Sequence, residues 1–553
     1  MKNIIKIVVF ILLLVNTVQA EGIRQKYKEN QNIKHKYKEA ESYLDDENYE
    51  EALIIFQELL SRDTLNANIN YKIGLCYLNI SAQEKKSIKY LELASKNISL
   101  KNSSDKFKEK TVPIDVLFYL GKAYHLNYEL DKAEMAFVEF KNKLNKNDKR
   151  LKSKVDYELR TCETTRLLMK TPINIKIENL GSSINTKYDE HSPIISADNK
   201  SLIFTSKREG NTGGRQSFDG QYFEDIYISY FDGKKFSKAE KISSNINTDG
   251  HDACSALSHD GKQLLIFRSK GDGGLFISEN NNNTWSKPKK LPGHINSIYR
   301  ETSACFSKDG ETIYFTSDRD GGYGGLDIYK TTRLRNGRWS KVKNMGPKIN
   351  TKYDEESPYE SQTGNHFFFA SKGHNTMGGY DIFICAKNQN GEWGSPKNVG
   401  YPVNTPYNQI FETSTADSKI FYIASNTYKG YGRSDIFRII LPDNHIKNVV
   451  EQKVIVNNIQ QKENNRQKVE QPVKVQYTKK TVDTLKKTNI EVDTIIEITQ
   501  KNIIIDNQST NNIVLSDNNI NSIHSLCLLI LLIIGSLFII IYWIAIYNKE
   551  KNR

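Results

Sequence analysis

The heptapeptide INTKYDE occurs twice in the chain, at residues 184–190 and at residues 349–355. Degenerate copies begin at Ile246, Ile295 and Val403, so that five copies follow one another at intervals of 62, 49, 54 and 54 residues. A second motif of the type FTSDRDGGYGG follows each copy, and a third of the type GGLDIYK closes each unit. Repeats of about 40 to 50 residues made of short strands are typical of propeller blades.

Each unit can be divided into four short strands, of which SPIIS, SLIFTS and DIYIS are the first three in the first unit. The fourth begins at a recurring aromatic residue, and Asp, Asn and Gly occupy the tight turn between the first two. No fourth strand follows the last unit, whereas the strand INIKIENLG, residues 173–181, precedes the first unit without a partner. The sequence therefore predicts a five-bladed ring closed by its own N-terminal strand. Six blades remain an alternative if residues beyond 441 contribute.

The consensus INT-x-Y-D-E-x-S-P, followed by S-x-D-G-x-x-L-x-F-x-S and G-G-x-D-I-Y, resembles the WD40-like, TolB-type propeller repeat of bacterial cell-envelope proteins. The resemblance covers residues 173–441. It implies a β-propeller for this part of the chain.

Residues 33–170 have a different pattern, in which small and aromatic residues recur at helical spacing. Ala40, Ala52 and Phe56 mark a first helix pair, and Gly74 and Gly121 lie in the helices that follow. Small residues at these positions let one helix approach the next, as in tetratricopeptide repeats. We expect a tetratricopeptide-like α-solenoid of three units and a last helix near residues 147–170, with a simple supporting bundle as the alternative.

The two ends of the chain predict its compartment. Residues 1–20 combine Lys2 and Lys6, an apolar core and the ending Val18-Gln19-Ala20, which is the pattern of a signal peptide. Residues 442–524 read as a low-complexity linker, and the uncharged residues 525–547 as a single transmembrane helix. The basic tail, residues 548–553, is then cytoplasmic, and the body is exported, into the periplasm of a two-membrane cell.

This architecture is similar to that of the propeller subunit of type IX secretion and gliding machinery, but it lacks the OmpA-like domain that would bind peptidoglycan. Together with the predicted membrane anchor, the resemblance implies a non-enzymatic scaffold that binds other envelope proteins through its helical repeats and propeller. The alternative is a propeller that binds or hydrolyses a glycan or a peptide. The chain carries 78 Lys and Arg against 65 Asp and Glu, but no base-stacking motif or basic helix, so we expect no nucleic-acid partner.

Motifs for catalysis are missing from the sequence. It contains no G-x-S-x-G, H-E-x-x-H or P-loop, and no cofactor is expected. Asp198, Asp260, Asp309 and Asp417 are interpreted as turn residues rather than as a sialidase signature. The cysteines are scattered among the repeats, so buried free thiols are expected, with a disulfide between Cys254 and Cys305 as the alternative.

One candidate site emerges from the repeats themselves. Five residues after each landmark asparagine stand Glu190, Asp252, Glu301, Glu355 and Gln409. Five-fold repetition would arrange them as a ring around the channel mouth, where four carboxylates attract a cation or a basic segment of a partner. The alternative is structural: each carboxylate accepts hydrogen bonds from its own loop. Whether the ring binds a metal ion is left open by the sequence.

Overall fold

A computed structural model of the chain describes residues 29, 31–99, 109–270, 273–282, 284–426 and 430–451. The described residues belong to a compact unit that spans Met1–Lys453. The predicted signal peptide, most of the predicted linker and the predicted transmembrane helix lie outside the described residues. Within the described ranges, no helix is both long enough and apolar enough to cross a bilayer.

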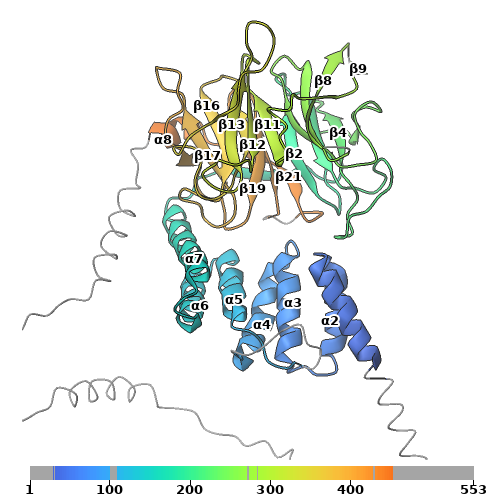
Figure 1. Cartoon of the computed structure of the whole chain (residues 1–553), viewed down its shortest axis with the longest axis vertical. Helices are drawn as coiled ribbons and strands as arrows, with labels where there is room; N and C mark the ends of the chain where they lie inside the picture. Colours follow the sequence, from blue (N-terminus) through green and yellow to red (C-terminus); the bar gives the residue numbers. More distant parts are fainter. Residues whose placement is uncertain are drawn as a thin grey trace, which may run out of the picture. The chain divides into compact units, whose positions relative to one another are not determined.

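The N-terminal part of this unit consists of helices that pack in sequence order (Figure 1). Residues 31–45 are helical and precede α2 (Tyr49–Leu60), α3 (Ala67–Asn79), α4 (Glu84–Ala94), the short 3-10 helix η1 (Ser95–Asn97), α5 (Asp115–Leu126), α6 (Leu130–Lys143) and α7 (Lys149–Leu168). Each of the helices α2 to α6 contacts the next one along the chain. The helical region predicted for residues 33–170 is therefore present, whereas its assignment to the tetratricopeptide class stays a prediction.

Two glycines allow consecutive helices to pack closely in this region. A Cβ atom at Gly74 of α3 would lie 2.6 Å from the side chain of Leu91 in α4. A Cβ atom at Gly121 of α5 would lie 2.6 Å from the ring of Phe137 in α6. Both partner side chains are fully buried, so a larger residue at either glycine would push the helices apart.

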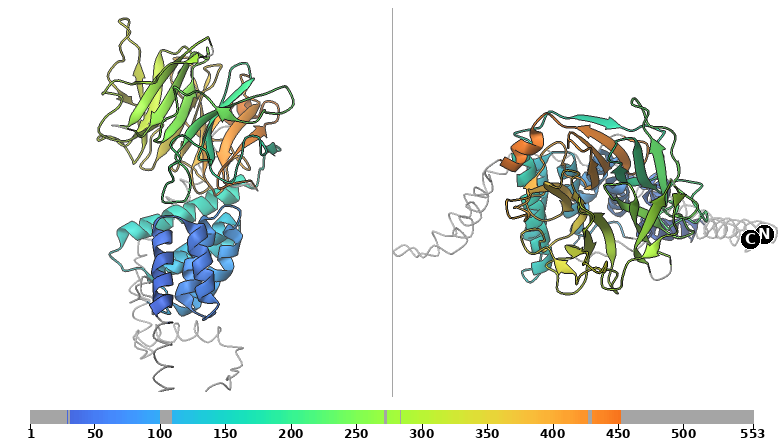
Figure 2. Two further views of the ribbon diagram at one scale, coloured as in Figure 1. Left: turned by 90° about the vertical axis from the view of Figure 1, so that its right-hand side faces the viewer. Right: turned by 90° about the horizontal axis from the view of Figure 1, so that it is seen from above.

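The remainder of the unit is a β-propeller of five sheets arranged around an axis (Figure 2). Four of the sheets have four antiparallel strands, and the second sheet has a fifth short strand, β9 (Thr284–Trp285), that pairs with β8 (Gly274–Asn281). The first strand of each repeat is innermost, because the five first strands contact one another in cyclic order. The first blade contains β2 (Glu190–Ile195), β3 (Ser201–Ser206), β4 (Asp225–Tyr230) and β5 (Glu240–Lys241). The second contains β6 (Asp252–Leu257), β7 (Gln263–Arg268), β8 (Gly274–Asn281), β9 (Thr284–Trp285) and β10 (Lys289–Lys290). The third contains β11 (Glu301–Phe306), β12 (Thr312–Ser317), β13 (Asp327–Thr332) and β14 (Lys343–Asn344).

The last two blades show how the ring closes. The fourth blade contains β15 (Glu355–Glu360), β16 (His366–Ser371), β17 (Asp381–Ala386) and β18 (Lys397–Asn398). The fifth contains β19 (Gln409–Ser414), β20 (Ile420–Ser425) and β21 (Asp435–Ile440), and its outer strand is β1 (Lys176–Asn179) from the start of the propeller. Lys176 pairs with Ile440, and Asn179 pairs with Phe437. The prediction that INIKIENLG completes the last of five blades is confirmed.

The outer strand of each blade differs from its prediction in one respect. The recurring aromatics were expected to start this strand, but Phe236, Trp339 and Trp393 form isolated bridges that close the hairpin after the third strand. The outer strand follows later and pairs over two residues in blades one to four. The aromatic side chains are instead packed into the hydrophobic clusters between blades, where their large apolar area is buried.

A seven-residue helix, α8 (His445–Glu451), follows the last strand. Its Ile446 and Val449 are buried in the cluster that contains Val399 and Leu441. This helix covers apolar side chains at the junction of the fourth and fifth blades.

Candidate functional site

The five residues predicted to form a ring at the channel mouth all begin an innermost strand. Glu190, Asp252, Glu301, Glu355 and Gln409 are the first residues of β2, β6, β11, β15 and β19. Their exposed fractions are 0% or 2%. In the described part of the chain, no hydrogen bond or ion pair joins one of these side chains to another. The structure thus places the five at equivalent positions, but buried and separate.

The partners of Glu301 illustrate the arrangement. Its carboxylate accepts hydrogen bonds from the Ser297 backbone N–H at 3.1 Å and from the Ser297 hydroxyl at 2.6 Å. The Ser317 hydroxyl donates at 2.9 Å, and Arg319 Nη2 lies 2.9 Å away. Arg319 Nη2 also donates to the Ile295 carbonyl at 2.7 Å. The carboxylate therefore ties the INT loop, the first strand and the second strand of one blade together.

The same network recurs in the first two blades. Arg208 approaches Glu190 at 3.3 Å, and Arg268 Nε donates to Asp252 at 2.6 Å. Thr186 and Thr248 supply the loop N–H and hydroxyl donors. Because the donors come from the residue's own blade, this geometry fits the structural alternative for the ring.

The fourth blade departs from this pattern. Glu355 accepts from Thr351 and from the Ser371 hydroxyl at 2.7 Å, but it has no arginine. His374 occupies the equivalent place, where its Nε2 lies 2.9 Å from the Ile349 carbonyl. Burial raises the pKa of Glu355 to about 7, because a charged carboxylate loses its hydration there. In the fifth blade the residue is the neutral Gln409, which accepts from the Thr405 N–H.

The landmark asparagine of each repeat has a role that the sequence interpretation missed. Asn350 Oδ1 accepts the Ile328 N–H at 2.8 Å, and its Nδ2 donates to the Ile328 carbonyl at 2.9 Å. Ile328 belongs to the third strand of the preceding blade. The amide thus pairs with a neighbouring strand as another backbone would. Asn185, Asn247 and Asn404 make the same two bonds to Ile436, Ile226 and Ile382, and Asn296 bonds Leu275 in this way.

We call these five side chains the blade latches: Asn185, Asn247, Asn296, Asn350 and Asn404. All are at most 8% exposed. The signal for them was available in the sequence, because asparagine is the landmark present in every copy. The identity of the bonded strand was not available, because it belongs to another repeat.

The residue after each predicted ring position is the one that reaches solvent. His191, Ala253, Thr302, Glu356 and Ile410 are partly exposed in all five blades. Burial raises the pKa of Glu356, although a hydrogen bond from Thr302 and the charge of Arg300 oppose this shift. Glu356 is the acidic member of this partly exposed set.

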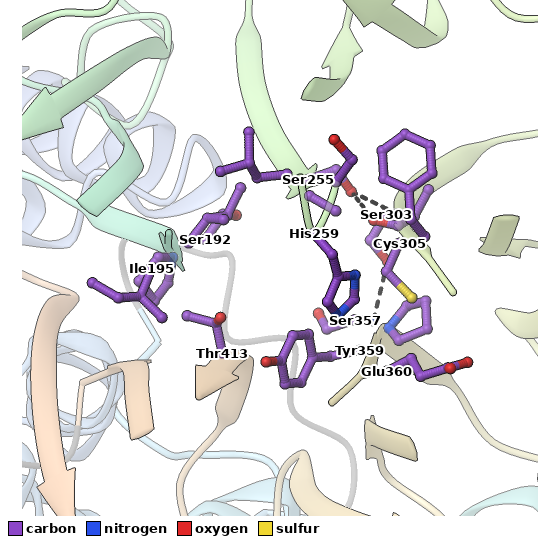
Figure 3. A pocket seen from close by; sticks show the side chains of 18 of the residues that line it. Ser192, Ile195, Ser255, His259, Ser303, Cys305, Ser357, Tyr359, Glu360 and Thr413 are labelled. Atoms are coloured by element: carbon purple, nitrogen blue, oxygen red, sulfur yellow. Dashed lines mark hydrogen bonds between the residues drawn. The ribbon is translucent and has the colours of Figure 1, made fainter. Parts of the chain in front are cut away.

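Further along the inner strands lies a central cavity of about 50 Å³ (Figure 3). All five innermost strands contribute side chains to it. Hydroxyl groups hold neighbouring strands together around it: Ser255 Oγ donates to the Ala304 carbonyl at 2.8 Å and accepts the Ala304 N–H at 2.6 Å. Ser303 Oγ accepts the Ser357 N–H at 3.0 Å.

Three side chains lining the cavity have polar atoms without a hydrogen-bond partner among the residues that the structure describes. These atoms are both ring nitrogens of His259, Ser357 Oγ and Glu360 Oε2. Burial lowers the pKa of His259. A neutral imidazole and a hydroxyl can donate to and accept from a small polar ligand.

The carboxylates that line the cavity bear on the chemistry it can support. Among the described residues that line it, Glu360 is the only carboxylate, whereas glycoside hydrolysis ordinarily uses a pair. The described residues contain no group of three or more His, Cys, Asp or Glu that could hold a metal ion.

The hairpin aspartates act as the sequence interpretation expected. Asp309 Oδ1 accepts the Ser307 hydroxyl at 2.6 Å and the Glu311 N–H at 3.0 Å, and Gly310 between them has a φ of +71°. Asp198, Asp260 and Asp417 make the equivalent bonds. Cys254 and Cys305 are buried free thiols.

Comparisons with known proteins give fold-level similarities. No protein-family model matches the chain, and no curated protein matches it. Among solved structures, it is similar to TolB from Acinetobacter baumannii at 18% identity and a TM-score of 0.31, over 54% of this chain and 71% of that one. It is also similar to an α-L-arabinofuranosidase from Lactobacillus brevis, at 11% identity and a TM-score of 0.31, over 48% and 94% of the two chains. The assignment of five blades rests on the strand pairing of this chain, not on these similarities.

Proposed function

We propose that this protein is an exported, membrane-anchored scaffold without enzymatic activity, which binds other envelope proteins through its helical repeats and its propeller. Its helical part acts as a tetratricopeptide-like module, and residues 525–547 anchor it with the C-terminus in the cytoplasm. An assembly of the secretion or gliding type is the setting we infer for it.

The observation that carries this proposal is the junction between the helices and the propeller. The Tyr157 hydroxyl of α7 lies 2.9 Å from the Lys372 carbonyl and 2.8 Å from the Gly378 carbonyl, both in a loop of the fourth blade. The Thr165 hydroxyl donates to the Met377 carbonyl at 2.9 Å. The acceptors of these hydrogen bonds are backbone carbonyls, so the bonds fix the position of the loop backbone relative to α7.

Charged and aromatic contacts extend this junction. The ring of Tyr157 lies 4.8 Å from that of Tyr353, and the Arg160 guanidinium is placed over both rings. Glu50 of α2 accepts from Arg433 in a loop of the fifth blade at 2.6 Å. A junction of this kind supports a scaffold, because two binding modules joined rigidly hold their partners at a fixed separation.

The helical part offers an exposed apolar surface to a partner. On α6, Met135 is 72% exposed, and Val138, three residues further along the same helix, is 44% exposed. Exposed apolar side chains that cluster mark interaction sites more often than isolated ones do. We infer that α6 contributes to partner binding.

Site-specific photo-crosslinking in cells tests the proposal. A photo-reactive amino acid replacing Met135 in the full chain should form adducts with a small set of envelope proteins. The matched control is the exposed polar residue Ser153 of α7, which should give few adducts. Equal adducts at both positions, or none at Met135 in a stably produced protein, would contradict a partner-binding role for the helices.

The topology has its own test. A tag placed after Arg553 should survive protease added to spheroplasts, whereas the propeller should be digested. A protected propeller would overturn the proposed orientation.

The second candidate, a propeller that binds a glycan or a peptide, is favoured by the polar atoms of His259, Ser357 and Glu360 that have no partner. Thermal-shift measurements of the full chain with oligosaccharide and peptide libraries test it. A hit that Glu360→Gln weakens would favour this candidate, and hydrolysis of the hit would overturn the non-enzymatic assignment.

A further inference from the structure

The outer edge of the propeller is strongly basic on one side. Three segments form this edge in the first three blades: residues 231–245, 279–291 and 333–348, each with the hairpin and the outer strand of its blade. Together they contain 13 Lys and Arg against 3 Asp and Glu. This difference of +10 accounts for most of the net charge of +13 carried by the whole chain. We call these three segments the basic edge.

The other two blades do not share this charge. Their corresponding segments, residues 387–399, 173–181 and 441–451, contain 4 Lys and Arg against 4 Asp and Glu. The charge of the propeller edge is therefore strongly asymmetric, although the five blades repeat one sequence pattern.

The cations of the basic edge are available to a partner. Every Lys and Arg of the three segments is exposed except Arg333, which is half-buried over the Trp339 ring at 4.8 Å. Lys241 pairs with Asp225 at 3.0 Å. Lys289, Arg335 and Lys343 take part in no ion pair within the described part of the chain. Their charges face solvent without an internal counter-charge.

A second observation concerns the hairpin of the third blade. Leu334 is 46% exposed near its tip, and it lies between Arg333 and Arg335 in the sequence RLRNGR. An exposed leucine flanked by arginines suits the boundary of a bilayer, where the apolar side chain enters the acyl region and the guanidinium groups bind phosphates.

Lysines on edge strands also have a simpler explanation, since they prevent sheets from pairing edge to edge. That explanation requires similar protection at each exposed edge. It does not account for a charge of +10 on three blades and none on the other two, nor for the exposed Leu334.

We propose that the basic edge binds the surface of an anionic bilayer, with its Lys and Arg at the lipid headgroup phosphates and Leu334 in the interface. Juxtamembrane cations contribute additively near an anionic surface, and the effect falls off within a Debye length. Two neighbouring blades can lie against a plane at once, which brings the cations of the second and third blades to the surface together. The proposal does not depend on the C-terminal anchor.

Energy transfer to labelled lipid tests this contact in the full chain. A donor dye is attached to Asn336→Cys at the hairpin tip. The described cysteines are buried, and Cys527, outside the described residues, is replaced by serine. The probes are acceptor-labelled vesicles of phosphatidylcholine alone, or of phosphatidylcholine with about one-third phosphatidylglycerol.

We expect strong energy transfer with the anionic vesicles, little with the neutral ones, and loss of transfer in about 1 M salt. In the triple variant Lys289→Gln, Arg335→Gln and Lys343→Gln, the lipid concentration that gives half-maximal transfer should rise by at least about tenfold. Three exposed lysines outside the basic edge, which also take part in no ion pair within the described part of the chain, provide the matched control: Lys170→Gln, Lys200→Gln and Lys262→Gln. This control should behave as the parent does.

Equal effects of the two triple variants would overturn the proposal, because the net charge of the protein, and not the basic edge, would then account for lipid binding. Equal transfer with neutral and anionic vesicles would overturn it as well. If the basic-edge variant loses binding to soluble polyphosphate while lipid charge has no effect, the partner is a soluble polyanion and the bilayer proposal fails. Failure of the C-terminal anchor alone is recognised separately by co-sedimentation: the chain then does not pellet with neutral vesicles, whereas energy transfer with anionic ones persists.

Discussion

Replacing the blade latch Asn185 by alanine probes the closure of the ring. Asn185 is 1% exposed, and it bonds the first blade to the fifth. Its Oδ1 accepts the Ile436 N–H at 2.8 Å, while its Nδ2 donates to the Ile436 carbonyl at 3.0 Å and to Asn179 Oδ1 at 2.9 Å. The variant leaves the buried Ile436 N–H without a partner, whereas the Ile436 carbonyl keeps the Leu180 N–H at 3.3 Å.

The expected loss follows from these bonds. A buried donor left without a partner costs about 1–3 kcal/mol, and each further lost hydrogen bond about 1 kcal/mol. With two further bonds lost, the free energy of unfolding should fall by about 3–5 kcal/mol, which corresponds to about 6–20 °C in Tm for a large domain.

Thermal unfolding followed by tryptophan fluorescence measures this loss, because Trp285, Trp339 and Trp393 all lie in the propeller. The control is Asn390→Ala at an exposed hairpin position, which should shift the free energy by less than about 0.5 kcal/mol. If the two alanine variants melt together, the latch does not hold the blades and the reasoning is refuted.

Three further predictions concern single side chains. Because burial raises the pKa of Glu355 from 4.5 to about 7, its protonated form is favoured in the folded state, and stability should decline as pH rises from 4.5 to 7. Glu355→Gln should flatten that part of a pH series of urea unfolding curves, and an unchanged slope would contradict the assignment. Gly324→Ala should prevent stable folding, since its Cβ would lie 2.1 Å from the Tyr353 carbonyl oxygen. The control Gly293→Ala, whose Cβ would have its nearest atom at 3.9 Å, should be almost neutral in melting experiments. Equal Tm values for the two variants would refute the clash. Tyr157→Phe should cost about 1–2 kcal/mol at the helix–propeller junction and increase amide hydrogen exchange in residues 372–378, while unaltered exchange there would show that the hydroxyl does not hold the loop.

The candidate site was predicted from the sequence only in part. The spacing placed Glu190, Asp252, Glu301, Glu355 and Gln409 at equivalent positions, and the structure has them at the start of the five innermost strands. Each of these buried residues is followed by a partly exposed one, which is the two-residue period expected for a strand. The sequence did not show which of the two alternating sets would be buried, because alternation alone does not tell which face of an inner strand packs more tightly.

The sequence by itself predicted the repeated unit and the strand that closes the ring, and it favoured five blades over six. These features follow from local chemistry, since turn residues, alternating strands and an unpartnered strand can each be recognised within one repeat. Only the tertiary structure decided that Asn185 bonds Ile436, 251 residues away, that Glu356 and not Glu355 is reached by solvent, and that five strands enclose one cavity. These contacts join residues of different repeats, so they form only when the repeats pack against one another in the closed ring.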